Sequence, residues 1–104
     1  MAVIEITADN FEKEVLNASC PVLLDFWASW CMPCRMLSPV VDEIAEEYSD
    51  SIKVGKVNVD EQSGLAQQFG IMSIPTLVVF QNGQNVAVKV GVQSKAAILA
   101  MLGF

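Results

Sequence analysis

One stretch of the chain, residues 22–48, constrains the fold more than any other. Residues 22–28 are almost continuously apolar, which is typical of a central β-strand covered on both faces. Residues 35–48 carry apolar side chains at helical spacing with acidic side chains opposite them. The sequence therefore predicts a buried strand that leads into an amphipathic helix. The positions expected to face inward on that helix are Met36, Leu37, Val40, Val41, Ile44, Ala45 and Tyr48.

Two cysteines lie at the junction of this strand and helix, in the sequence Trp-Cys-Met-Pro-Cys. At a separation of three, Cys31 and Cys34 lie on one face of a helix start, close enough for their sulfurs to bond. Pro33 supports a helix start, because the first turn does not need its missing N–H. Free backbone N–H groups and the helix dipole favour a thiolate at Cys31. We therefore predict that Cys31 is the nucleophile and that Cys34, further in and less exposed, is the resolving thiol.

Zinc binding is the alternative use of a Cys-x-x-Cys sequence. The chain has 3 Cys and no His, so a tetrahedral site would need carboxylates or a second chain. The sequence shows no signal peptide, and the same spacing near a βαβ pattern then favours redox chemistry, so we expect no metal. Cys20, which precedes Pro21 away from the pair, is expected to be a small core or loop residue.

Composition limits the classes of function. A length of 104 residues predicts one domain, residues 1–104, that needs no metal or disulfide to complete its core. With 53% hydrophobic and 17% charged residues, a compact soluble domain is expected. The net charge of -6 argues against nucleic acid and anionic membranes as partners. No stretch approaches the roughly 20 apolar residues that span a bilayer, and no export signal begins the chain, so we expect a cytoplasmic protein.

The remaining pattern predicts alternating strands and helices. A strand at 3–6 precedes a helix whose start has capping-box spacing between Asp9 and Glu12. The inward residues of that helix are expected to be Phe11, Val15 and Leu16. A strand at 52–59 is followed by a short helix at 65–69.

The C-terminal part predicts a hairpin and a last helix. Residues 75–81 and 84–90 flank Asn-Gly, the strongest short signal for a two-residue turn, so these strands are expected to be antiparallel. Ser94 is expected to cap the final helix. The predicted order, βαβαβαββα, is an α/β fold with a central mixed sheet of about five strands and about four flanking helices.

Several landmarks occur in one fixed order along the chain. Residues 25–36 read Asp-Phe-Trp-Ala-Ser-Trp-Cys-Met-Pro-Cys-Arg-Met, and residues 74–76 read Ile-Pro-Thr. Residues 80–83 and 89–91 add Phe-Gln-Asn-Gly and Lys-Val-Gly. Together these segments resemble the thioredoxin family from end to end. The resemblance implies the thioredoxin fold, thiol–disulfide exchange with client proteins, no bound cofactor, a monomer, and re-reduction by an NADPH-dependent thioredoxin reductase.

Asp25 is the most informative residue outside the cysteines. A carboxylate within an apolar strand is costly unless it is paired or protonated, so burial is expected to raise its pKa. The resemblance implies that Asp25 lies beneath the disulfide and exchanges protons with Cys34, directly or through water. It also places Lys56 near Asp25, where a positive charge would oppose the rise. A structural Asp–Lys pair without a catalytic part is the open alternative.

The resemblance also implies a surface that binds clients. It predicts a cis Ile74–Pro75 bond against the two sulfurs, although sequence alone favours trans and a proline that opens an edge strand. The Ile74 backbone would pair with an extended client segment. Met32 replaces the glycine usual in the family, which predicts an altered reduction potential. The substrate-binding residues are expected to be Trp30, Met32, Pro33, Met72, Ser73, Ile74, Pro75, Gly91 and Val92, with plain packing equally open for Met72 and Val92.

Two other functions compete with this interpretation. A glutathione-dependent relative of the glutaredoxin type shares the fold and a Cys-x-x-Cys, but Trp30 and the landmarks along the whole chain argue against it. A redox-inert binding subunit would use the same surface without turnover. The presence of both cysteines and of Asp25 disfavours that second alternative.

Overall fold

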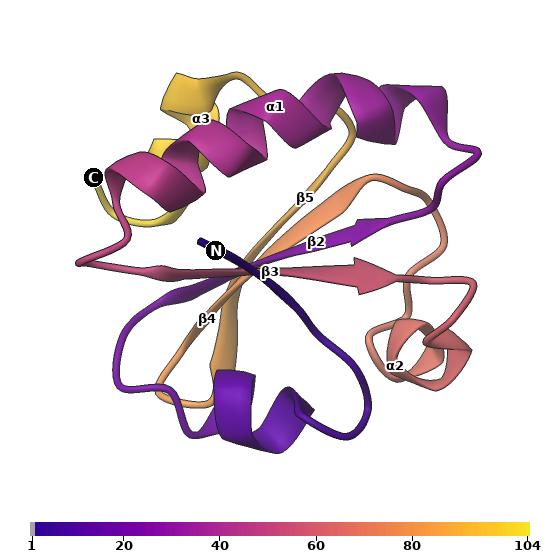
Figure 1. Cartoon of the computed structure of the whole chain (residues 1–104), viewed down its shortest axis with the longest axis horizontal. Helices are drawn as coiled ribbons and strands as arrows, with labels where there is room; N and C mark the ends of the chain where they lie inside the picture. Colours follow the sequence, from indigo (N-terminus) through magenta and orange to yellow (C-terminus); the bar gives the residue numbers. More distant parts are fainter. Residues whose placement is uncertain (1) are drawn as a thin grey trace.

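A computed structural model describes residues 2–104 as a five-stranded sheet with helices on both faces (Figure 1). The strands are β1 (Val3–Glu5), β2 (Val22–Trp27), β3 (Lys53–Asn58), β4 (Thr76–Gln81) and β5 (Gln84–Val90). The helices are η1 (Glu12–Leu16), which is π-helical, α1 (Met32–Glu47), α2 (Ser63–Gln68) and α3 (Lys95–Met101). The predicted α/β fold class, with a mixed sheet and four helices, is confirmed.

The strand order across the sheet is β1-β3-β2-β4-β5. Strands β1, β3 and β2 run parallel to one another, whereas β4 runs antiparallel to β2 and β5 runs antiparallel to β4. Strand β2 therefore lies in the middle, as its apolar run predicts. In the register of the sheet, Asp25 is the partner of Lys56 on β3 and of Leu77 on β4.

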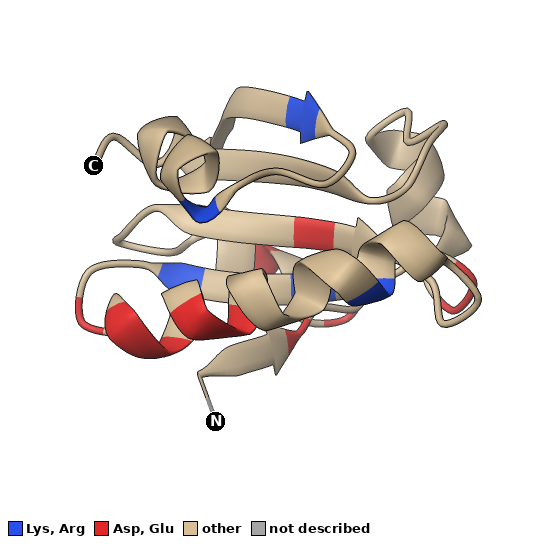
Figure 2. Cartoon of the chain, turned by 90° about the horizontal axis from the view of Figure 1, so that it is seen from above, with Lys and Arg blue, Asp and Glu red and all other residues tan. Residues whose placement is uncertain are grey.

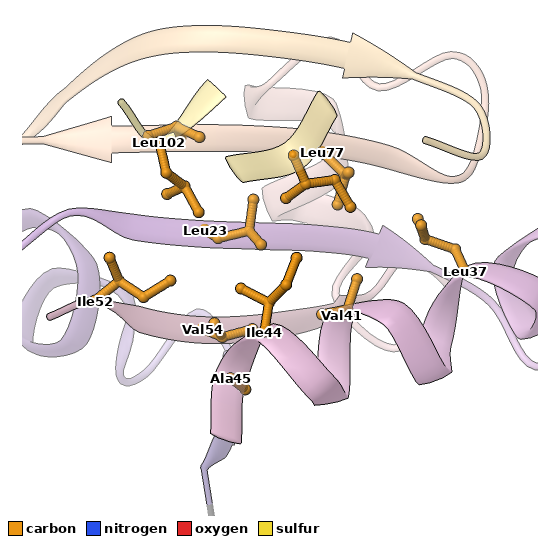
Figure 3. Packing of buried hydrophobic residues seen from close by; sticks show 11 residues of the cluster. Leu23, Leu37, Val41, Ile44, Ala45, Ile52, Val54, Leu77 and Leu102 are labelled. Atoms are coloured by element: carbon orange, nitrogen blue, oxygen red, sulfur yellow. The ribbon is translucent and has the colours of Figure 1, made fainter. Parts of the chain in front are cut away.

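The core has two halves, one on each face of the sheet. Figure 1 shows α1 and α3 on one face, and α2 with the short helix η1 on the other. Leu23 of β2 packs in the first half with Ile44 and Leu77 (Figure 3). Its neighbour Leu24 packs in the second half, with Phe11 among others. Successive side chains of a strand point to opposite faces, so both faces of β2 must be apolar.

Local signals set the hairpin and the last helix where the sequence predicts them. Asn82 and Gly83 have φ values of 54° and 77°, the left-handed conformation that a two-residue turn of this type requires. The Ser94 hydroxyl accepts a hydrogen bond from the Ala97 N–H at 3.1 Å and caps α3. Gly70, with a φ of 65°, follows the end of α2.

Three local predictions are wrong. The Asp9 and Glu12 capping box does not form, because Asn10 closes the preceding turn by accepting a hydrogen bond from the Thr7 N–H at 2.8 Å. Leu16 is exposed, because the π-helical turn η1 directs Val15 inward and leaves Leu16 at the surface. Met36 is exposed as well, because it lies at the edge of the buried stripe of α1.

Charge is distributed unevenly along α1. Figure 2 shows acidic residues gathered on its C-terminal half, whereas Arg35 is the one charged residue in its first ten positions. The Lys95 ammonium of α3 contacts the Glu43 and Glu47 carboxylates at 3.2 and 2.6 Å. Both hydrogen bonds raise the pKa of Lys95, and the bond to Glu47 has the larger effect. The end of α1 that carries the cysteines is thus free of acidic side chains.

Candidate active site

The two cysteines form a disulfide at the start of α1. Cys31 is the N-cap residue and Cys34 lies in the first turn, with 5.3 Å between their Cα atoms. The Cys34 N–H donates a hydrogen bond to the Cys31 sulfur at 3.2 Å. Cys31 and Cys34 are 4% and 3% exposed, so the expected difference in exposure is slight in the bonded state. What distinguishes Cys31 is the N–H that points at its sulfur.

The segment before β4 lies against the disulfide. The Ile74–Pro75 bond is cis, as the resemblance implies, and the Ile74 carbonyl oxygen lies 3.8 Å from the Cys31 sulfur. Pro75 is buried, and its carbonyl oxygen accepts a hydrogen bond from the Gly91 N–H at 2.8 Å. This contact fixes the end of β5 beside the proline. The two cysteines themselves pack with Ala28, Val59 and Ile74, from three separate parts of the chain.

Asp25 lies inside the protein next to this site. It is 1% exposed, and its Oδ1 atom has no hydrogen-bond partner among residues 2–104. Burial raises the pKa of the Asp25 carboxyl from 3.8 to about 6, with Lys56 lowering it and Asp42 raising it by smaller amounts. Asp25 and Cys34 line one cavity of roughly 100 Å³, which exceeds the ~10–15 Å³ that one water molecule needs. The cavity that Asp25 and Cys34 share is therefore large enough to hold a water molecule.

Lys56 contacts α1 rather than the Asp25 carboxylate. Its ammonium lies 2.7 Å from the Ser38 hydroxyl and 3.0 Å from the Asp42 carboxylate. No ion pair joins Lys56 and Asp25 within residues 2–104. The prediction that Lys56 lies beside Asp25 is confirmed by their register in the sheet, but the charge of Lys56 acts on Asp25 from a distance.

An apolar surface surrounds the disulfide. Trp30 is 69% exposed, and its indole N–H donates a hydrogen bond to the Asp60 carboxylate at 2.9 Å. Met72 is 96% exposed, so it does not have the packing role left open for it. Val92, the other residue left open, is 47% exposed. A groove of about 200 Å³ beside the site is lined by Trp30, Val59, Ala66, Ile71, Met72, Ser73 and Ile74.

Of the other expected residues, Met32 and Pro33 are exposed in the first turn of α1. Ser73 is exposed and Ile74 is half-buried, where it packs on the two cysteines. Cys20 is free and half-buried near Ile52, in a different pocket from the disulfide.

Sequence reasoning missed four polar residues around the site. Arg35 and Ser38 line the cavity with Asp25. Asp42 pairs with Lys56, and Asp60 accepts the hydrogen bond of Trp30. Residues four apart on a helix share a face. The spacing of Cys34, Ser38 and Asp42 was therefore the signal that could have pointed to Ser38 and Asp42.

Within residues 2–104, no group of three or more His, Cys, Asp or Glu side chains is placed to hold a metal ion. None of the helices there has both the length and the apolar content needed to cross a membrane.

Comparison with known proteins agrees with the geometry. The thioredoxin family model matches residues 2–103. The chain is 56% identical to thioredoxin 1 of Synechococcus elongatus over 93 residues, which cover 89% of this chain and 87% of that protein. It is 51% identical to a thioredoxin of Pyropia yezoensis over 102 residues, or 98% and 95% of the two chains. It is 48% identical to a thioredoxin of Acidithiobacillus ferridurans over 101 residues, or 97% and 94%.

Proposed function

The chain belongs to the thioredoxin family and is a protein thiol–disulfide oxidoreductase, and we propose that it reduces client disulfides with Cys31 as the attacking thiolate and Cys34 as the resolving thiol. The observation that carries this assignment is the position of Cys31 at the N-cap of α1, with the Cys34 N–H directed at its sulfur. Such a position favours the thiolate, the form that attacks disulfides.

The reaction has two exchange steps. The Cys31 thiolate attacks one sulfur of the client disulfide, a new S–S bond forms, and the other client sulfur leaves as a thiolate that takes up a proton. The Cys34 thiolate then attacks the Cys31 sulfur and releases the second client thiolate, which is protonated in turn. The client gains two electrons and two protons, and the protein is left with the Cys31–Cys34 disulfide.

Asp25 is proposed as the base for the second step. A buried Cys34 thiol is a poor nucleophile until it loses its proton, and Asp25 shares a water-sized cavity with it. A carboxyl whose pKa is raised to about 6 is mostly ionised at neutral pH, so it can accept the Cys34 proton. It also binds that proton more strongly than an ordinary Asp does. Lys56 acts on the same carboxyl by opposing the rise in its pKa.

The client is proposed to lie across the apolar surface around the disulfide. The half-buried Ile74 would offer its backbone to an extended client strand beside the cysteines. Exposed apolar side chains beside a reactive group favour protein rather than small polar substrates. The proposed contacts are Trp30, Met32, Pro33, Met72, Ser73, Ile74, Pro75, Gly91 and Val92.

The electrons are proposed to come from NADPH through a separate thioredoxin reductase, with no cofactor bound to the chain itself. This would make the protein an electron carrier between the reductase and its clients. A cytoplasmic location and a monomeric state are part of the same proposal. The thioredoxins that align with nearly the whole chain support it.

A coupled assay tests chemistry, reductant and roles together. NADPH, thioredoxin reductase and the protein are expected to reduce a disulfide client, whereas glutathione in place of the reductase is expected to support little turnover. Faster turnover with glutathione would identify a glutaredoxin-type enzyme, and no turnover even with dithiothreitol would identify a binding subunit.

Single substitutions in the same assay assign the roles. Cys34→Ser is expected to accumulate a mixed disulfide with the client at Cys31, detected by mass analysis, while Cys31→Ser gives neither turnover nor trapping. Cys20→Ser is the matched control and is expected to behave as the unchanged protein. Trapping through Cys34 in the Cys31→Ser variant would reverse the assignment.

A further inference from the structure

We propose that Ser38 and Asp42 are positioning residues, which hold the Lys56 ammonium at the boundary of the Asp25 cavity and so set the pH at which Asp25 accepts a proton from Cys34. This inference rests on the proposed role of Asp25 as the base for Cys34. It concerns two residues of α1 that touch neither sulfur and act through Lys56.

The geometry shows a lysine between two spaces. The inner cavity of roughly 100 Å³ is lined by Asp25, Cys34, Ser38 and Lys56, among others. A neighbouring groove of about 330 Å³ is lined by Asp42, Lys56 and other residues, and it is the more open of the two. Lys56 lines both spaces, whereas Ser38 lines only the inner one and Asp42 only the outer one. The ammonium therefore lies where the two spaces meet, with one polar partner on each side.

The two partners hold Lys56 in different ways. Ser38, which lines the inner cavity, accepts a hydrogen bond from the ammonium at 2.7 Å and so holds the ammonium on that side. Asp42 pairs with the ammonium at 3.0 Å, and its side chain is about half exposed. As residues i and i+4 of α1, both reach Lys56 from the same helix face. Lys56 can lose one partner and still remain bound to the other.

Charged and titratable groups reach the Asp25 carboxyl from two elements. Lys56 of β3 lowers its pKa, and Asp42 of α1 raises it. Cys34 and Arg35 of α1 also line its cavity. On the opposite side the partner strand β4 contributes the uncharged Leu77. Glu5 of β1 lines the outer groove and faces Lys56 rather than Asp25.

Removing Asp42 and removing Ser38 should shift the pKa of Asp25 in opposite directions. Asp42→Asn removes a negative charge that favours protonated Asp25 and leaves Lys56 on Ser38, so the pKa of Asp25 should fall by about 0.5 or more. Ser38→Ala leaves Lys56 with Asp42 alone, so the ammonium withdraws toward the outer groove and the pKa of Asp25 should rise by about 0.3. Ser38→Thr keeps the hydroxyl and should restore the original value.

The experiment follows the Asp25 carboxyl and the resolving step across pH 5 to 9. Carbon NMR of the reduced protein reports the protonation of Asp25 directly. Stopped-flow mixing with an aromatic disulfide whose released thiolate absorbs visible light separates attack by Cys31, the first release, from resolution by Cys34, the second release. Glu46→Gln, which removes another exposed acid from α1, is the matched control for net charge.

Shifts of the Asp25 midpoint to lower pH in Asp42→Asn and to higher pH in Ser38→Ala, with none in Glu46→Gln or Ser38→Thr, would support the inference. Unchanged midpoints, or shifts of the same sign in both variants, would overturn it. If the Asp25 midpoint moves as expected but the second release does not follow it, the positioning role stands. In that case the proposed role of Asp25 as the base fails.

Discussion

Replacing Asp25 by asparagine is expected to stabilise the protein at neutral pH. The carboxyl is 1% exposed and its Oδ1 atom has no partner in the described part of the chain, so its charged form is poorly solvated in the folded state. The pKa of Asp25 rises from 3.8 to about 6 on folding. At about 1.4 kcal/mol per pH unit, this difference corresponds to roughly 3 kcal/mol of lost stability when the carboxyl must ionise. Asparagine has nearly the same shape and carries no charge, so it should recover most of that free energy.

The sign of the pH dependence follows from proton binding. Between pH 3.8 and about 6, the folded protein holds a proton at Asp25 that the unfolded chain has already lost. Stability therefore falls as pH rises through this window, and the loss is complete above it. The free energy of unfolding of Asp25→Asn minus that of the unchanged protein should be near zero below pH 4. It should rise to about 3 kcal/mol at pH 7.

Urea unfolding of the oxidised protein, followed by circular dichroism at pH 4, 5, 6, 7 and 8, measures this difference directly. Both proteins keep the Cys31–Cys34 bond under these conditions, so the unfolded states carry the same cross-link. Glu46→Gln serves as the control, because it removes an exposed carboxylate and should give a small difference without this pH profile.

A difference that stays constant from pH 4 to 8, or a less stable Asp25→Asn at pH 7, would refute the reasoning. Either result would mean that the carboxyl is compensated in a way that its burial does not reveal. The same variant should slow resolution of the mixed disulfide if Asp25 is the base for Cys34, as proposed above. The gain in stability and the loss of rate would then share one cause.

Other stability predictions follow from packing and capping. Gly55→Ala should cost about 1–3 kcal/mol, because a Cβ there would lie 2.5 Å from the Ile6 side chain. In the matched control Gly64→Ala, on helix α2, the added Cβ meets no described residue within 4 Å, so this variant should instead gain about 0.5–1 kcal/mol by urea unfolding. Ser94→Ala should lose the cap of α3 at a cost of about 1 kcal/mol, and Ser94→Asp should retain it. Leu23→Ala should cost about 2–5 kcal/mol through a cavity in the core, and a value below 1 would contradict the packing in Figure 3.

The fold was predictable from sequence wherever one strong local signal decides the outcome. The apolar run of β2, the Asn-Gly turn and the Ser94 cap each act within a few residues, and the structure confirms all three. The errors occur where local signals compete. The capping box at Asp9 does not form because the neighbouring Asn10 makes hydrogen bonds to the backbone instead. The sequence does not reveal which of the two side chains makes them.

The site was predictable only in part, because half of it depends on distant contacts. The cysteines and Asp25 lie on one continuous segment, so their proximity follows from a strand that leads into a helix. Ser38 and Asp42 resemble ordinary solvent-facing residues of an amphipathic helix. Their contact with Lys56 arises only once β3 pairs with β2 beneath α1.

The change from parallel to antiparallel pairing beside β2 explains why the groups meet. Because β4 runs against β2, the beginning of β4 lies next to the end of β2, and Phe26 is the register partner of Thr76. The cis proline that precedes Thr76 is thereby carried to the start of α1, where the cysteines lie. On the other side β3 runs parallel to β2, so Lys56 arrives beside Asp25. A β4 parallel to β2 would place Pro75 at the opposite end of the sheet, so the pairing direction of β4 determines whether this site can exist.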